Sequence, residues 1–294
     1  GDHRDLHVRS RRQRQMCIRD SGKPDEEFGN SGFIDLHVGL GENSSSLYVS
    51  MTSPGVIFKN LIIVGSRVSE GNPAAKGNIR AFNANTGELV WVFKTIPEPG
   101  QKGYESYEDP DAYLRLGGAN AWSGLTIDSK NGILFAPTGS VSYDFYGGDR
   151  KGDNLFANSI LAINAESGER LWHYQTVHHD VWDRDLPAPP VIFNYKLKDS
   201  VVPALAQVTK SGYTFLLNRL TGEPIYDIVE RTVPSKSFLT GEKLSKTQPT
   251  PTFPKPFSRQ YLSNSDINPF VSEKEKDSLT KVYLSIIKDD IFSP

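Results

Sequence analysis

The stretch TVHHDVWDRDLPAPP, residues 176–190, places two histidines and three aspartates within the eight residues 178–185. Side chains of these types can bind metal ions or transfer protons. They also cap turns in polar loops, where no chemistry takes place. A metal site and a polar loop are therefore the two interpretations of this stretch, and the rest of the chain must distinguish them.

Length and composition are those of a globular protein. The chain has 294 residues, which is enough for one large domain or two small ones, and 37% of its residues are hydrophobic. The net charge of −2 gives no reason to expect a nucleic acid or an acidic membrane surface as a partner. No apolar run approaches the roughly 18 residues that span a bilayer.

The first residues differ from the rest of the chain. They are rich in arginine, lack an apolar segment typical of a signal peptide, and include RRQRQMCIRD at residues 11–20, which resembles a translated sequencing adapter. We therefore predict that residues 1–21 are a non-native or disordered segment. The single cysteine, Cys17, lies in this segment, so we expect neither disulfides nor thiol chemistry in the remainder.

An internal repeat organises the central part of the chain. AFNANTGELVW at residues 81–91 and AINAESGERLW at residues 162–172 share the pattern Ala-x-Asn-x-x-(Thr/Ser)-Gly-Glu-x-x-Trp, and LLNRLTGEPIY at residues 216–226 is a weaker copy. Each copy predicts a strand, a turn with glycine at positive φ, and a second strand that ends in a large aromatic residue. Sheets that repeat in this way indicate a β-propeller.

Near the end, the pattern changes. Residues 249–269 are rich in proline and serine, and a capping box at Ser272 and Glu275 introduces an amphipathic helix with Leu279, Val282 and Ile286 on one face. We predict an all-β fold with this partly helical C-terminal segment. The expected division is residues 22–234 for a partial propeller and residues 235–294 for an extended linker plus helix, as an insertion in the same domain.

The repeat and four further segments together resemble the quinoprotein dehydrogenases that use pyrroloquinoline quinone, especially the membrane-type glucose dehydrogenase branch. The segments are GGANAWSGLTID, TGSVSYDFYGG, TVHHDVWDRDLPAPP and TKSGYTFLLNR. The resemblance covers residues 22–294. It implies that the repeats are tryptophan-docking motifs of an eight-bladed β-propeller, of which this chain holds about three to four blades.

The resemblance also assigns the chemistry. Oxidation of an alcohol carbon by hydride transfer needs a base, an acceptor and a cation that polarises the acceptor. Asp183 matches the family's catalytic base, which also touches the metal, and Lys210 matches a lysine that hydrogen-bonds the quinone oxygens. By the residues alone, a turn-capping role for Asp183 and an exposed turn position for Lys210 remain open.

The remaining site residues follow from the same comparison. Trp122 matches the tryptophan beneath the planar cofactor, and Arg67 resembles an arginine that binds a cofactor carboxylate. Glu70 lies where the family has an acidic metal ligand, so Glu70 and Asp183 are the predicted protein ligands of a divalent cation, Ca²⁺ or Mg²⁺. Ser142 falls near another cofactor contact, where alcohol-oxidising relatives have Asn; this departure favours the glucose-type branch.

These matches also suggest roles for the rest of the opening stretch. Because His178 and His179 are adjacent, their side chains would point to opposite faces of a strand, and both cannot easily bind one metal ion. We expect one to be structural and the other to line the pocket. Asp180 and Asp185 are expected to be turn and blade-packing groups paired with Arg184.

The predicted function is oxidation of an aldose sugar or an alcohol, with electrons passed to a membrane quinone or a cytochrome. The alternative is a non-catalytic propeller scaffold of the kind that assists outer-membrane protein assembly. The resemblance implies a periplasmic protein, attached to the inner membrane through a part that is not in this chain. An incomplete propeller exposes strand edges, so we expect the 294 residues alone to bind cofactor poorly and to be inactive.

Overall fold

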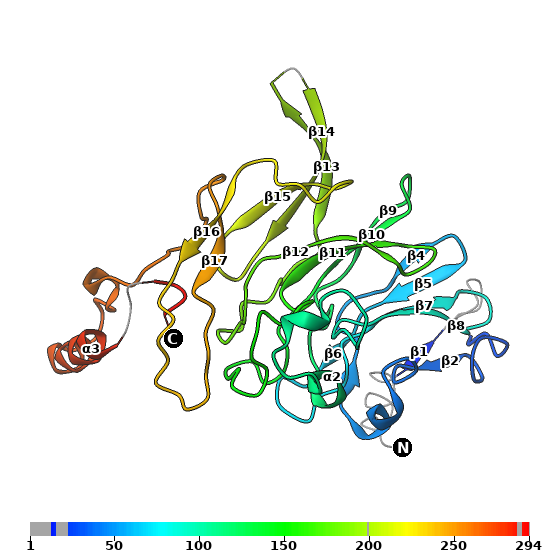
Figure 1. Ribbon diagram of the computed structural model, residues 1–294, viewed down its shortest axis with the longest axis horizontal. Helices are drawn as coiled ribbons and strands as arrows, with labels where there is room; N and C mark the ends of the chain where they lie inside the picture. Colours follow the sequence, from blue (N-terminus) through cyan, green and yellow to red (C-terminus); the bar gives the residue numbers. More distant parts are fainter. Residues whose placement is uncertain (1–12, 16–22, 199, 287–289, 294) are drawn as a thin grey trace.

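The computed structural model describes residues 13–15, 23–198, 200–286 and 290–293. Short antiparallel strands dominate it, and they form sheets that follow one another along the chain (Figure 1). The strands are β1 (Gln13–Gln15), β2 (Phe33–Asp35), β3 (Val49–Ser50), β4 (Val56–Phe58), β5 (Leu61–Val64), β6 (Arg67–Val68), β7 (Ile79–Asn83), β8 (Leu89–Phe93), β9 (Thr126–Asp128), β10 (Ile133–Pro137), β11 (Ser159–Asn164), β12 (Arg170–Gln175), β13 (Val191–Leu197), β14 (Ser200–Val208), β15 (Thr214–Asn218), β16 (Ile228–Thr232) and β17 (Thr247–Pro251). The helices are α2 (Ala112–Arg115) and α3 (Glu273–Ser285), with 3-10 turns η1 (Glu42–Ser46), η2 (Tyr104–Ser106) and η3 (Asn264–Asp266).

Three of the sheets are successive propeller blades. The first blade has the strand order β4-β5-β7-β8, the second β9-β10-β11-β12, and the third β13-β14-β15. Every ladder within them is antiparallel. The predicted all-β, partial propeller is therefore confirmed.

The hydrophobic core lies between the blades. One cluster joins the first and second blades and includes Ile63, Leu134 and Leu161, and a second cluster joins the second and third blades and includes Phe135 and Leu205. The second blade is thus covered on both faces. This explains why all five residues of β10 are buried, instead of alternating as in a strand with one wet face.

The three repeat copies form the same turn. Each starts with an asparagine whose side-chain oxygen accepts a hydrogen bond of 2.8 to 2.9 Å from the backbone N–H two residues on, and each ends with a glycine at φ 76–77°. The asparagines are Asn83, Asn164 and Asn218, and the glycines are Gly87, Gly168 and Gly222. Positive φ explains the glycine, because other residues are strained there.

Each tryptophan of the repeat docks on the next copy of the turn. The Trp91 ring lies on Gly168, where an added Cβ would be 2.7 Å from a ring carbon, and its Nε1 donates to the Ala165 carbonyl at 3.2 Å. Trp172 lies on Gly222 in the same way, again with 2.7 Å between an added Cβ and a ring carbon. The third copy has Tyr226 instead, whose ring packs against Phe253.

The antiparallel connections determine where the loops lie. In a four-stranded meander, the connection from the second to the third strand and the connection to the next blade lie at the same end of the sheet. The docking turns join the third and fourth strands, so they lie at the opposite end. Residues 65–78, 94–125, 138–158, 176–190 and 209–213 are therefore brought to one end.

The two ends of the chain differ in part from expectation. Strand β1 lies within the predicted 1–21 segment and pairs with β2, which lies outside that segment. Residues 1–12 and 16–21 lie outside the described residues. At the other end, β17 pairs with β16, so a strand lies inside the predicted linker and joins it to the preceding segment. The domain boundaries remain predictions.

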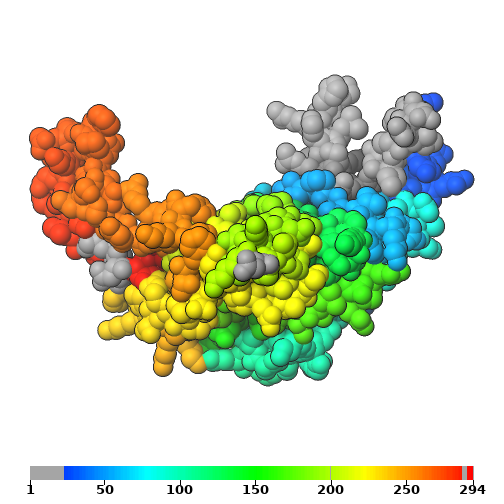
Figure 2. All heavy atoms as spheres, turned by 90° about the horizontal axis from the view of Figure 1, so that it is seen from above, coloured from blue at the N-terminus to red at the C-terminus, as the bar shows by residue number. Residues whose placement is uncertain are grey.

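Helix α3 starts as predicted, with a capping box between Ser272 and Glu275. Its apolar stripe does not enter the core, because Leu279, Val282 and Ile286 are 41–54% exposed. Figure 2 shows the C-terminal segment, in orange and red, standing out to one side of the blades. Ile287, which continues the predicted apolar stripe, lies outside the described residues. Within the described part of the chain, no helix is long and apolar enough to cross a membrane.

The docked glycine turn can be tested with two alanine substitutions. Gly168→Ala combines a φ of 77° with a contact of 2.7 Å to the Trp91 ring, whereas Gly100→Ala has a φ of 83° and nothing within 4 Å. We expect Gly100→Ala to lower the free energy of unfolding by about 1–2 kcal/mol, and Gly168→Ala by a further ~1–3 kcal/mol from overpacking. Urea unfolding midpoints measure the difference, and equal losses would contradict the docking.

Candidate active site

One cavity of about 340 Å³ lies at the loop end of the blades. All six predicted site residues line it. The full lining comprises Thr52, Arg67, Val68, Ser69, Glu70, Asn120, Trp122, Ser140, Ser142, Asp144, Asp183, Asp185 and Lys210. The sequence comparison therefore selected residues that the fold brings together from five separate loops.

A tight turn places Asp183 in the cavity. The Asp180 carboxylate accepts hydrogen bonds from the backbone N–H groups of Trp182 at 3.0 Å and Arg184 at 2.7 Å, which closes the turn around Asp183. Asp183 itself has a φ of 56°, in the left-handed region that aspartate tolerates better than most residues. The predicted turn-capping role therefore belongs to Asp180, which leaves the Asp183 side chain available to the cavity.

Lys210 is the cation closest to this carboxylate. Its Nζ lies 2.7 Å from Asp183 Oδ1 and 3.6 Å from Asp185 Oδ2, and 5.8 Å from the centroid of a Trp122 ring. Burial lowers the pKa of Lys210, but the hydrogen bond to Asp183 and the charges of the aspartates outweigh it, so the pKa lies above its ordinary value. Lys210 is therefore charged at neutral pH.

Asp185 orients the indole of Trp122. One carboxylate oxygen accepts from Trp122 Nε1 at 2.9 Å, and the other accepts from the Ser140 backbone N–H at 2.8 Å. Burial raises the pKa of Asp185, opposed by the nearby Lys210 and reinforced by neighbouring aspartates. The expectation of a packing role alone for Asp185 was thus incomplete, because the residue also lines the cavity.

Asp144 is the site residue that the sequence interpretation missed. Burial, together with the charges of Asp185, Asp183 and Glu70, raises its pKa to about 8. The only signal was its position in TGSVSYDFYGG, one of the segments that carried the resemblance. The cavity therefore gathers four carboxyl groups, and burial and mutual repulsion favour the protonated form of Asp144.

The opposite wall carries Arg67 and Glu70. Arg67 Nη2 lies 3.4 Å from Glu70 Oε1, and the two side chains are 47% and 67% exposed. An ion pair of this length at this exposure contributes little to stability, so both groups can rearrange around a ligand. Ser142 donates its hydroxyl proton to the Ser69 carbonyl at 2.8 Å, which leaves its oxygen as an acceptor facing the cavity.

The histidines do not line the cavity, so the expectation that one of them would was wrong. His178 contacts Gln175 and Glu230, and His179 contacts the Gly152 carbonyl and Glu242. The expected pairing of Arg184 with the aspartates was also wrong. The Arg184 guanidinium donates instead to the backbone carbonyls of Lys210 and Ile291. Contacts with later segments thus hold these side chains on the outside of the turn.

A metal centre built from protein groups alone is not found. Among residues 13–15, 23–198, 200–286 and 290–293, no three His, Cys, Asp or Glu side chains are grouped closely enough to hold a metal ion. The histidines and aspartates of the 176–190 stretch therefore form no such group of three within the described residues. The cation predicted at Glu70 and Asp183 would need oxygen ligands in addition to these two carboxylates.

Comparison with known proteins identifies the family. Residues 8–294 match the family described as "PQQ: Glucose/ethanol/alcohol dehydrogenase, beta-propeller domain". The chain belongs to this family. It is 35% identical over 253 residues to the quinate/shikimate dehydrogenase (quinone) of Acinetobacter baylyi, covering 84% of this chain and 30% of that protein. It is 36% identical over 244 residues to quinoprotein glucose dehydrogenase A of Acinetobacter calcoaceticus, covering 78% and 29%.

Solved structures support the same fold. The quinohemoprotein alcohol dehydrogenase of Comamonas testosteroni matches 82% of this chain and 35% of its own, with a TM-score of 0.63 at 23% identity. A europium-containing methanol dehydrogenase matches 81% and 41%, with a TM-score of 0.62 at 18% identity. The chain spans about three tenths of the length of the curated relatives it matches.

The raised pKa of Asp144 predicts a pH-dependent stability. The folded protein keeps this proton until about pH 8, whereas an unfolded aspartate loses it near the ordinary value of 3.8. The stabilising contribution of protonated Asp144 is therefore complete below that value and is lost as pH rises through about 8. We expect Asp144→Asn to flatten the decline in unfolding free energy across this window in protein free of cofactor and metal.

The measurement is urea unfolding at a series of pH values. Asp111→Asn, at an exposed aspartate outside the cavity, is the matched control and should keep the original pH slope. An unchanged slope in Asp144→Asn would show that Asp144 titrates as an ordinary aspartate.

Proposed function

We propose that this chain carries part of the active site of a pyrroloquinoline quinone-dependent dehydrogenase that oxidises an aldose sugar or an alcohol. The observation that carries the proposal is the convergence of Trp122, Arg67, Lys210 and Asp183 on one cavity, with the Lys210 ammonium 2.7 Å from the Asp183 carboxylate. A scaffold would not need an ion pair and an indole directed into the same hollow.

The cavity fits a planar, anionic cofactor. Its volume of about 340 Å³ lies in the ~300–1,000 Å³ range of small-molecule sites. The Trp122 indole, fixed by its hydrogen bond to Asp185, offers a flat apolar surface for stacking. Arg67 and Lys210 offer donors to carboxylate and carbonyl oxygens. When bound, the quinone supplies the electrophilic acceptor for hydride transfer.

Asp183 is the proposed general base. Its carboxylate is a third exposed, reaches the cavity, and can accept the proton of a substrate hydroxyl placed beside it. Lys210 is charged and lies next to this carboxylate, so it can stabilise negative charge that develops nearby in the transition state. Asp185 positions the Trp122 ring, and does not need to touch the substrate.

A divalent cation, Ca²⁺ or Mg²⁺, would be held by Glu70 and Asp183. Both residues line the cavity, and carboxylate oxygens are suitable ligands for these ions. Oxygens of the cofactor would add to this coordination. Such an ion would also reduce the repulsion among Glu70, Asp144, Asp183 and Asp185.

The substrate class and the surroundings follow from the family. We propose a glucose-like aldose or an alcohol as substrate, and a membrane quinone or a cytochrome as electron acceptor, in the periplasm. The glucose dehydrogenase and quinate dehydrogenase relatives, at 36% and 35% identity, support a small polyhydroxy substrate without selecting one.

The base assignment is tested in the complete protein that carries this sequence. With pyrroloquinoline quinone, Ca²⁺ or Mg²⁺, and a panel of aldoses and primary alcohols, dye reduction measures turnover. We expect Asp183→Asn to lower kcat by about 10²- to 10⁴-fold, the usual contribution of a general base. Asp111→Asn should leave kcat unchanged.

Two outcomes would contradict this assignment in different ways. Full turnover by Asp183→Asn would place the base elsewhere in the cavity. An unaltered protein that neither binds the cofactor nor turns over any substrate would favour the scaffold.

The cation is tested separately. Chelation with EDTA should abolish turnover, and added Ca²⁺ or Mg²⁺ should restore it. We expect Glu70→Gln to raise the half-saturating cation concentration by at least about 10-fold, which is the effect of losing even an outer-shell partner. Turnover that survives thorough chelation, or an unchanged cation requirement in Glu70→Gln, would remove Glu70 from the metal site.

A further inference from the structure

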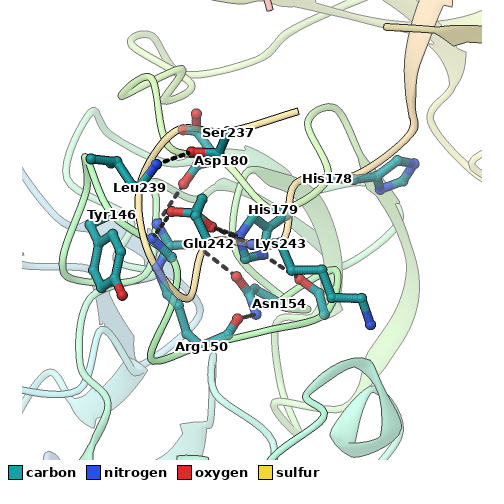
Figure 3. Close-up of polar contacts among 12 residues, drawn as sticks. Tyr146, Arg150, Asn154, His178, His179, Asp180, Ser237, Leu239, Glu242 and Lys243 are labelled. Atoms are coloured by element: carbon teal, nitrogen blue, oxygen red, sulfur yellow. Dashed lines mark hydrogen bonds and ion pairs between the residues drawn. The ribbon is translucent and has the colours of Figure 1, made fainter. Parts of the chain in front are cut away.

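The loop between β16 and β17, residues 233–246, folds back over the segments that carry the cavity aspartates. Figure 3 shows Glu242 of this loop directed towards His179, with Arg150, Asn154 and Asp180 beside them. The Glu242 side chain is 2% exposed, and that of His179 is 1% exposed. A carboxylate so completely buried requires strong partners.

Glu242 bridges two segments of the site. Its Oε1 lies 2.8 Å from His179 Nε2, and its Oε2 accepts a hydrogen bond of 2.6 Å from the Gly147 backbone N–H. Burial raises the pKa of Glu242, but the contacts with His179 and Gly147 outweigh burial and hold the pKa below its ordinary value. The group is therefore an anion that binds both the 144–148 segment and the 176–185 segment.

His179 is matched to this anion. Its Nδ1 lies 2.8 Å from the Gly152 carbonyl, and its Nε2 faces Glu242, so both ring nitrogens face oxygen acceptors. Contacts at both nitrogens fix the orientation of the imidazole ring. Gly147 is needed for the close fit, because a Cβ at that position would lie 2.3 Å from His179 Nε2.

Arg150 connects this pair to the catalytic turn. Its guanidinium is buried and donates to the backbone carbonyl of Asp180 at 2.5 Å and to that of Tyr143 at 3.0 Å. Tyr143 precedes Asp144, and Asp180 closes the turn around Asp183. The buried cluster therefore touches the backbone at the base of both acidic segments of the cavity.

A second anchor from the same hairpin holds the neighbouring residue. The buried side chain of Gln248, in β17, accepts a hydrogen bond from the His178 backbone N–H and donates one to the His178 carbonyl, each 2.8 Å long. The 233–248 region thus fixes His178 by its backbone and His179 by its side chain. Asp183 and Asp185, on the other side of the turn, remain free to face the cavity.

We propose that Glu242 is a positioning residue for the oxidation: it binds His179 and Gly147 and thereby holds the turn that carries Asp183. This inference rests on the proposed function for its catalytic part. Glu242 lines no part of the cavity, so it acts through the 176–185 turn and not on substrate or cofactor. A base displaced by about 1 Å can lose up to ~10²-fold in rate, which is the effect that the Glu242 contacts would prevent.

The test compares Glu242→Gln with Lys243→Gln in the complete protein that carries this sequence. Glu242→Gln keeps the size of the side chain and an acceptor for the Gly147 N–H, but it replaces the carboxylate oxygen that faces His179 Nε2 with a neutral amide group. Lys243 lies on the same loop, and its exposed ammonium pairs with Glu108, away from the turn. Steady-state kinetics and amide hydrogen exchange of the 180–185 peptide, measured without cofactor, are the two readouts.

We expect Glu242→Gln to lower kcat by about 10-fold, with the substrate KM within twofold, because positioning of the base affects the transition state more than substrate binding. We also expect exchange of the 180–185 peptide to become about 10-fold faster, because an uncompensated buried partner weakens the local structure. Lys243→Gln should match the unaltered protein in both. His179→Gln alone should be as harmful as Glu242→Gln, and the double variant should lose less than the sum.

Each remaining outcome has a defined meaning. Equal kcat and equal local exchange in Glu242→Gln and Lys243→Gln would overturn the proposal, as would a loss of kcat that only follows a smaller folded fraction by circular dichroism. If the unaltered protein shows no turnover, the proposed function fails. The exchange of the 180–185 peptide then still supports or overturns the role of Glu242 in holding the turn.

Discussion

The contact between a tryptophan ring and the bare backbone of a glycine turn is the constraint on which the arrangement of the blades depends. It occurs twice, at Trp91 on Gly168 and at Trp172 on Gly222, with the same closest approach of 2.7 Å to an added Cβ. A flat ring against a residue without a side chain allows neighbouring sheets to approach closely along their whole length. The cores between the blades, with fully buried strands such as β10, follow from that approach.

The docking contacts and the cavity lie at opposite ends of the blades. The docking turns are nearly identical in every copy, whereas the connections at the opposite end range in length from residues 209–213 to residues 94–125. Variation in the spacing of the repeats is therefore accommodated at the loop end, where the cavity lies. A rigid docking end and variable loops allow one scaffold to position different site residues.

How far the sequence predicts this structure depends on the range of the contacts. The repeat is local, so its turns, its docking tryptophans and the capping box of α3 could be recognised directly. The six predicted cavity residues were found only through their similarity to family segments, since no spacing rule brings Arg67 near Lys210. Asp144, and the partner of His179 at Glu242, depend on contacts between distant loops that one sequence does not reveal. The apolar stripe of α3 suggested burial, but most of it stays exposed because burial depends on what a helix packs against.

The density of charge in the 176–190 stretch has a structural reason that neither initial interpretation contained. The turn closed by Asp180 has two sides. Asp183 and Asp185 face the cavity, where their charges contribute to the raised pKa of Asp144. His178 and His179 face outwards, where Gln248 and Glu242 bind them. The carboxylates that line the cavity repel one another, so contacts on the other side of the turn are needed to hold it in place. Glu242 binds the side chain of His179 there, whereas Gln248 binds the backbone of His178.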